Sequence, residues 1–178
     1  MPYTTINKST DHFNTKLWTG NGSAGNAQTG IGFQPDWVWY KARSQSYNSG
    51  LFDVVRGTSK QIYSDQNSVE ATYSGVTSFD SDGFTLGTDA GGNQNSETYV
   101  AWNWKAGGGQ GSSNTDGSIN TTYTSANTTA GISIIKYNGN GSNGATIGHG
   151  LGVAPTFVMI KRTDTASNWI VATHANAF

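Results

Sequence analysis

A block of twelve residues occurs twice in this chain, 120 positions apart. Residues 30–41 read Gly-Ile-Gly-Phe-Gln-Pro-Asp-Trp-Val-Trp-Tyr-Lys, and residues 150–161 read Gly-Leu-Gly-Val-Ala-Pro-Thr-Phe-Val-Met-Ile-Lys. A shorter block, residues 18–23, recurs as residues 137–142. In both long copies a Gly-x-Gly-x-x-Pro motif precedes an apolar run, and proline fits only at the start of a strand because it has no N–H to donate. The repeat predicts two related β units, and two copies at so long a period are not a solenoid.

Composition decides which kind of fold these units form. The chain has 178 residues, of which 24 are glycine and 12% are charged. It is rich in Thr, Ser and Asn and poor in the residues from which helices are built. Aromatic residues make up 12% of the chain, including six tryptophans, and can fill the space between two sheets. We expect an all-β fold, an antiparallel two-sheet sandwich built from two sequence-related units.

Changes in composition along the chain place the expected boundaries. An N-terminal segment at residues 1–10 is followed by a first β unit at residues 11–106. Residues 107–130, rich in Gly, Ser, Thr and Asn, are expected to form a linker or loop, in which residues 119–123 could add one edge strand. The second β unit is expected at residues 131–178. It is about half as long as the first, so we expect these residues to be the N-terminal part of a longer polypeptide.

Four segments of the first unit are predicted to be further strands. Residues 76–79 and 84–87 flank the sequence Asp-Ser-Asp-Gly, which predicts a hairpin with glycine at the turn. Residues 98–105 alternate between two faces and are the clearest strand in the chain. Residues 50–56 form a shorter apolar run and are predicted to be a strand as well.

Charge and cysteine content exclude several classes of partner. The net charge is -1 and the ten Lys and Arg residues are scattered, so no basic stripe is available for nucleic acid. The absence of cysteine excludes disulfides and thiolate zinc sites. No apolar run approaches the length of a membrane span, and the first residues do not resemble a secretory signal, so we expect no membrane insertion.

Few residues in the chain suit catalysis or metal binding. Asp80 and Asp82 read as turn residues, Glu97 stands alone before a strand, and His149 lies between two glycines. A glycosidase needs two carboxyl groups about 5 to 10 Å apart across a cleft, and no such pair is evident. The Gly-x-Gly pairs lack the Lys-Ser/Thr of a phosphate-binding loop. We therefore expect no enzyme activity, no catalytic residue, no metal site and no cofactor.

The tryptophans offer the best candidates for ligand binding, because sugars stack on exposed indole rings. Trp37 and Trp39 lie on one face of a predicted strand whose other face is also apolar, so we expect this pair to pack in the core. Trp102 and Trp104 share a face of residues 98–105 and are expected to do the same. Trp18 and Trp169 lie nearer to loops. They are our candidate ligand-binding residues, as a partly exposed platform.

Several segments resemble a family of repeat-containing domains found in phage virion and tail-fibre-like proteins, especially those of marine phages. The similar segments are residues 3–8, 19–23, 30–39, 50–57, 78–87 and 99–108. The resemblance implies a jelly-roll sandwich of the concanavalin A type in a structural or host-recognition protein of a phage particle. It implies neither a ligand nor an active site.

The leading hypothesis is a non-enzymatic structural component of a phage particle, such as a tail, fibre or decoration protein. It would be located in the virion, act in assembly and host attachment, form a homo-oligomer and contact other virion proteins. The alternative is a carbohydrate-binding adhesin that recognises host surface glycans through exposed aromatic rings. A glycan-degrading enzyme on a similar fold is a third hypothesis, which we favour least because the sequence shows no pair of catalytic carboxyl groups.

Overall fold

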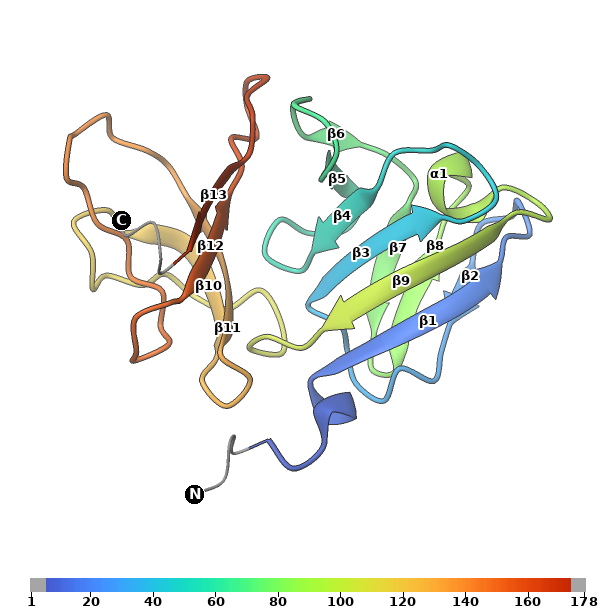
Figure 1. Ribbon diagram of the computed structural model, residues 1–178, viewed down its shortest axis with the longest axis horizontal. Coiled ribbons are helices and arrows are strands. Elements are labelled where there is room, and N and C mark those ends of the chain that lie inside the picture. Colours follow the sequence, from blue (N-terminus) through green and yellow to red (C-terminus); the bar gives the residue numbers. More distant parts are fainter. Residues whose placement is uncertain (1–5, 174–178) are drawn as a thin grey trace.

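The computed structural model describes residues 6–173 (Figure 1). Residues 1–5 of the predicted N-terminal segment and residues 174–178 of the predicted second unit lie outside the described residues. These residues contain two short helices, η1 (Ser9–Asp11) and α1 (Ala90–Asn93). The first nine strands are β1 (Phe13–Thr19), β2 (Asn26–Gln28), β3 (Trp37–Ala42), β4 (Gly50–Asp53), β5 (Lys60–Tyr63), β6 (Ala71–Thr72), β7 (Val76–Asp80), β8 (Gly83–Leu86) and β9 (Thr98–Trp104). The remaining strands are β10 (Thr121–Asn127), β11 (Ile132–Tyr137), β12 (Phe157–Ile160) and β13 (Ile170–Thr173).

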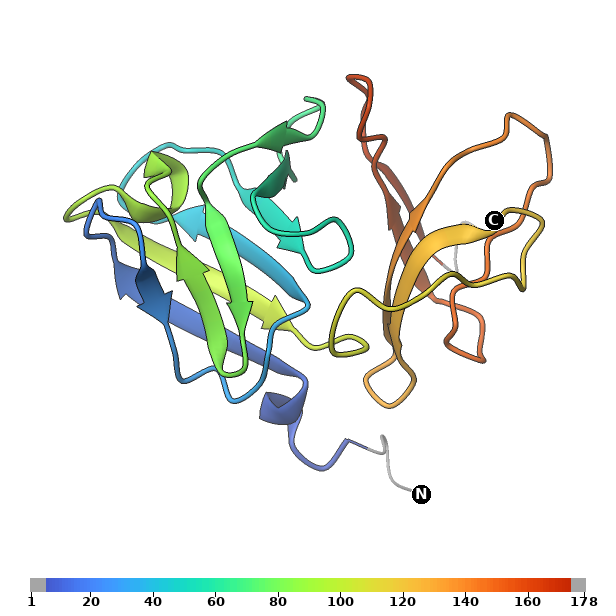
Figure 2. The same ribbon diagram turned by 180° about the vertical axis from the view of Figure 1, so that it is seen from behind.

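The strands of the N-terminal part form two sheets that lie against each other. The larger sheet has the order β1-β9-β3-β4-β5-β6, and the smaller has the order β2-β8-β7. Figure 2 shows the smaller sheet in front of the larger one. All pairings between these strands are antiparallel. The expected all-β, antiparallel class is confirmed, and the arrangement is consistent with a β-sandwich.

Side chains from both sheets meet in one hydrophobic core. Val38 and Tyr40 of β3 and Tyr99 and Ala101 of β9 are completely buried, and they alternate with half-buried neighbours. The smaller sheet contributes Phe84 among others. This alternation is what a strand with one face on a core requires. The predicted strand at residues 98–105 and its division into two faces are confirmed.

The predicted hairpin is present as β7 and β8, with Gly83 at its turn. A Cβ atom at Gly83 would lie 1.9 Å from the carbonyl oxygen of Gln28, so no larger residue fits. The strand predicted at residues 50–56 ends at Asp53. Beyond it the chain turns back, and the backbone N–H of Arg56 donates to the Asp53 carboxylate at 2.8 Å.

The first Gly-x-Gly motif is held by the turn that follows β7. The backbone N–H groups of Gly30 and Gly32 donate to the two carboxylate oxygens of Asp82, at 2.9 and 2.6 Å. Both glycines have positive φ, +83° and +90°, a conformation that side chains disfavour. In the second copy Gly150 and Gly152 adopt the same region, with φ of +69° and +73°.

The C-terminal part consists of two separate two-stranded sheets, β10-β11 and β12-β13. β10 forms inside residues 107–130, so this segment is not a linker throughout, and the edge strand suggested near residues 119–123 is present slightly further along the chain. β10 has few large apolar residues, yet it is ordered because its backbone pairs with β11 along nearly its whole length.

One buried carboxylate fixes the start of the connection between the two parts. Asp36 is completely buried, and its Oδ2 accepts hydrogen bonds from the backbone N–H groups of Ala106 at 2.7 Å and Gly108 at 2.8 Å. Burial raises the pKa of Asp36, while these hydrogen bonds lower it by a smaller amount. The chain therefore leaves β9 along a defined path.

Candidate functional site

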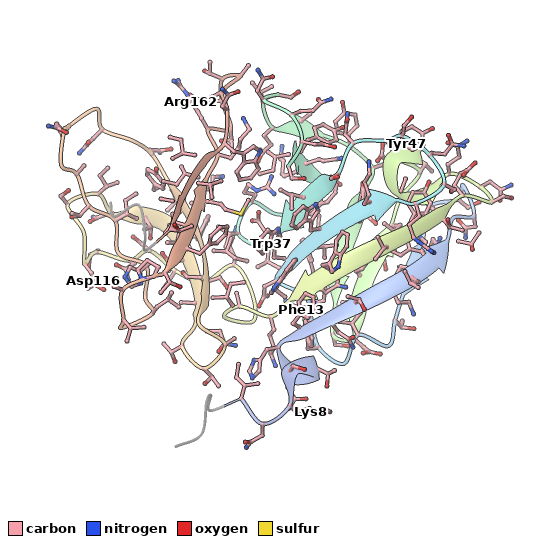
Figure 3. The ribbon with its side chains drawn as sticks, in the orientation of Figure 1. Lys8, Phe13, Trp37, Tyr47, Asp116 and Arg162 are labelled. Atoms are coloured by element: carbon pink, nitrogen blue, oxygen red, sulfur yellow. The ribbon has the colours of Figure 1, made fainter. Side chains whose placement is uncertain are left out.

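The outer side of the six-stranded sheet carries a continuous group of aromatic rings, which we call the aromatic face: Phe13, Trp37, Trp39, Trp102 and Trp104. They come from β1, β3 and β9, and each is half-buried. Phe13 and Trp37 lie on the side of this sheet that faces the viewer in Figure 3, away from the smaller sheet. The face is therefore separate from the core between the two sheets.

The strand register brings these rings together. Trp37 and Trp39 of β3 pair directly with Trp104 and Trp102 of β9, and Phe13 of β1 pairs with Trp104. The ring centres of Trp37 and Trp104 lie 4.5 Å apart, and those of Phe13 and Trp104 lie 5.0 Å apart. Trp39 and Trp102 are 5.6 Å apart. Contacts of this kind hold the rings in fixed orientations and leave part of each available to a partner.

The expectation that these four tryptophans pack in the core is wrong. The core between the sheets is filled by the opposite residues of the same strands, such as Val38, Tyr40 and Tyr99. Tyr40 and Tyr99 have hydroxyl groups with partners inside the fold, the Asp89 carboxylate and the Ala90 carbonyl. Alternation divides a strand into two faces, but it cannot say which of two apolar faces meets the second sheet.

The expectation that Trp18 is partly exposed is also wrong. Its side chain lies in the core with 9% of its surface exposed, stacked on Tyr99 with ring centres 5.3 Å apart. Its indole N–H donates to the carbonyl of Gly92 at 3.0 Å. Trp18 is the second-last residue of β1, and its place on the inward side of that strand buries it.

Trp169 is half-buried and borders an open cleft of about 670 Å³ between the N-terminal and C-terminal parts. The other lining residues are polar: Ser64, Asp65, Gln66, Asn67 and Asn168. The indole N–H of Trp169 donates to the carbonyl of Tyr63 at 2.8 Å, which fixes the ring at the edge of the cleft. Sequence analysis selected Trp169 but could not identify its polar neighbours, because residues 64–67 are distant in the chain.

The acidic residues and the histidine that sequence analysis weighed as catalytic or metal-binding candidates accept hydrogen bonds from other groups of the fold. Glu97 accepts from the Ser44 hydroxyl at 2.6 Å and from the Gln45 amide at 2.9 Å, and these bonds lower the pKa of Glu97. Its carboxyl group is thus poorly suited to donate a proton as a general acid. Asp82 holds the Gly-x-Gly motif, and this contact lowers the pKa of Asp82. His149 accepts from the backbone N–H of Leu151 at 3.1 Å.

The sequence matches the family described as "Domain of unknown function (DUF7483)" over residues 8–177. The chain belongs to the DUF7483 family. Comparison with curated proteins and with solved structures gave no match.

In this member of the DUF7483 family, a second, smaller cavity of about 130 Å³ lies beside α1 and includes Asp89 and Gln61 in its lining. Burial raises the pKa of Asp89, and the Tyr40 hydroxyl donates to its carboxylate at 3.2 Å. The side-chain oxygen of Gln61 is buried and has no hydrogen-bond partner among the described residues. Sequence analysis missed this site because Asp89 stands in a glycine-rich loop with no motif around it.

Within residues 6–173 of this DUF7483 chain, no group of three or more His, Cys, Asp or Glu side chains is placed to hold a metal ion. No helix in the same residues is long and apolar enough to cross a membrane. The aromatic face and the Trp169 cleft each have features suited to binding.

Proposed function

We propose that this protein is a non-enzymatic structural component of a phage particle, in a tail, fibre or decoration position. Its partners are other virion proteins and further copies of the same chain, with no role for nucleic acid or membrane insertion. The observation that carries the proposal is the aromatic face, a surface of stacked tryptophans on the outside of a sheet. The phage setting rests on the sequence segments that resemble virion and tail-fibre-like domains.

The aromatic face has the properties of an assembly surface. Centres of protein interfaces are enriched in Trp, Tyr and Phe and depleted in charged residues. Trp39 and Trp104 lie at the middle of the group, because each contacts three of the other four rings. Rings that are already stacked lose little conformational freedom on binding, which favours association. The low net charge of -1 adds little repulsion between copies.

The finer description of the fold belongs to the same proposal. We assign the sandwich to the jelly-roll, concanavalin A-like type, built from two related units. The support is the register of the two hairpins: Trp37 pairs with Asp53 in β3-β4, and Phe157 pairs with Thr173 in β12-β13. Both members of the second pair stand 120 positions after those of the first, as the sequence repeat does.

Self-association of the purified chain tests the assembly role. Wild-type protein should form oligomers in sedimentation velocity, and Trp102→Gln should weaken association by about 30-fold or more, as expected for an interface tryptophan. Thr77→Gln is the matched control, because Thr77 is exposed on the smaller sheet. Circular dichroism verifies that both variants fold. A wild type that stays monomeric at its highest soluble concentration, or equal association of both variants, would contradict the assembly role.

The phage setting has a separate test. Particles of a phage that carries this gene should contain the chain when purified virions are analysed by mass spectrometry, and a specific antibody should label one defined position on the particle. A chain that is abundant in infected cells but absent from washed particles would exclude a virion component, whatever its oligomeric state.

A carbohydrate-binding adhesin is the second candidate, and the Trp169 cleft favours it. An indole ring beside carboxylate and amide side chains offers a stacking surface together with donors and acceptors for sugar hydroxyls. Asp65, Asn67 and Asn168 supply those groups within the cleft. The cleft combines both features and is our candidate glycan site.

Binding of fluorescently labelled protein to host cells, with free surface polysaccharide as competitor, tests the adhesin role. Binding should saturate and be competed, and Trp169→Ala should lower affinity by about 5-fold to 100-fold, the loss typical of a contributing aromatic residue. Val153→Ala is the matched control, since Val153 is exposed and outside the cleft. Absence of saturable binding by folded protein would reject this candidate.

A further inference from the structure

The edge of β12 that faces away from β13 is unpaired in the described part of the chain. Among residues 6–173, the sheet that contains β12 has two strands, and β13 is the only neighbour of β12 in it. The pairing runs from Phe157 opposite Thr173 to Ile160 opposite Ile170. The backbone groups along the other edge of β12 are therefore open to pairing with an extended segment.

In the N-terminal part, the strand edge that corresponds to the open edge of β12 belongs to β3 and is paired. β3 pairs with β4 in the register that β12 and β13 repeat 120 positions later. On its other edge β3 pairs with β9, with Trp37 opposite Trp104 and Tyr40 opposite Ala101. Since β13 stands in the place of β4, the open edge of β12 stands on the side that β9 takes in the N-terminal part.

The side chains around this edge are more exposed than their counterparts. Phe157 is 54% exposed and Ile170 is 62% exposed. Val158 and Ile160 are half-buried, whereas the residues at the matching positions, Val38 and Tyr40, are completely buried. Protein sheets commonly protect an open edge with proline or a charged residue. The sequence Phe-Val-Met-Ile of β12 contains neither.

We propose that the open edge of β12 binds an extended polypeptide segment with the alternating pattern of β9, added as an antiparallel strand. Backbone hydrogen bonds would supply affinity and alternate side chains would supply specificity, as in other cases of strand addition. In the register of β9, a large aromatic residue stands opposite Phe157 and another opposite Met159, while a small residue stands opposite Ile160. This goes beyond the assembly role, because it specifies a second surface and the kind of segment that fits it.

A peptide with the sequence of residues 97–106, Glu-Thr-Tyr-Val-Ala-Trp-Asn-Trp-Lys-Ala, is the probe. Fluorescence anisotropy should show saturable one-to-one binding to the whole protein. At a free peptide concentration about ten times Kd, hydrogen exchange should slow by about tenfold at the β12 amides that face away from β13. A control peptide with proline at the positions of Val100 and Trp102 lacks two of the backbone donors that face β3 in the folded protein and should not bind.

Two protein variants separate the edge from the rest of the surface. Met159→Lys places a charge beside the bound strand and should weaken binding at least tenfold, while Val153→Lys, outside β12, should leave it unchanged. Three results would overturn the proposal. The first is that the peptide shows no saturable binding. The second is that hydrogen exchange slows only in β1 and β3, which would mean that the peptide replaces β9. The third is that the β12 amides of the wild-type protein are already protected without peptide, because two copies pair.

Discussion

Removal of the buried Arg56 side chain should destabilise the fold strongly. The side chain is 8% exposed, and its guanidinium group lies 2.6 Å from the Asp53 carboxylate and 3.2 Å from that of Glu70. It also donates to the carbonyls of Lys60 at 2.9 Å and Leu51 at 3.1 Å. Arg56→Met leaves the Asp53 charge buried without its partner, and such a change costs about 3–5 kcal/mol of unfolding free energy. For a chain of this size the melting temperature should fall by about 6–20 °C.

The matched control is Arg162→Met. Arg162 and Asp164 also lie 2.6 Å apart, but their side chains are 60% and 71% exposed, so water replaces the lost partner and stability should not change measurably. Urea unfolding followed by tryptophan fluorescence compares both variants. The double variant Asp53→Asn/Arg56→Met should be more stable than Arg56→Met alone, because it no longer buries an unpaired charge. A loss below about 1 kcal/mol for Arg56→Met, or equal losses for the two methionine variants, would refute the role of burial.

Three further predictions concern other parts of the fold. Trp18→Ala should lose about 3–5 kcal/mol in urea unfolding, while its exposed neighbour Leu17→Ala should change stability by less than about 0.5 kcal/mol, and equal losses would contradict the placement of Trp18 in the core. Gly32→Ala should lower stability by about 1–3 kcal/mol because φ is positive there, whereas Gly139→Ala, in open space without positive φ, should be nearly neutral in thermal unfolding. Because burial raises the pKa of Asp89 above 3.8, its contribution to stability is fully present below pH 3.8 and is lost as pH rises through the raised value. Asp89→Asn should remove that decline when stability is measured against pH, and an unchanged profile would contradict it.

Local patterns in the sequence predicted much of the secondary structure. The alternation of residues 98–105 predicted β9 and its two faces, and Asp-Ser-Asp-Gly predicted the turn between β7 and β8. The Gly-x-Gly-x-x-Pro motif predicted the starts of β3 and β12, because a proline that cannot donate and glycines with positive φ limit what the backbone can do. These features depend on neighbouring residues and can be read without knowledge of the tertiary fold.

The choice between inner and outer faces was decided only by the tertiary structure. Trp39 and Tyr40 are adjacent and both aromatic, yet Trp39 lies on the aromatic face and Tyr40 in the core, because the smaller sheet packs against one side of β3. The same packing buried Trp18, while the approach of residues 64–67 placed Trp169 beside a polar cleft. Which rings can meet a partner depends on contacts between segments far apart in the chain. A sequence pattern that alternates every two residues predicts where the strands lie, but it carries no information about contacts between distant segments.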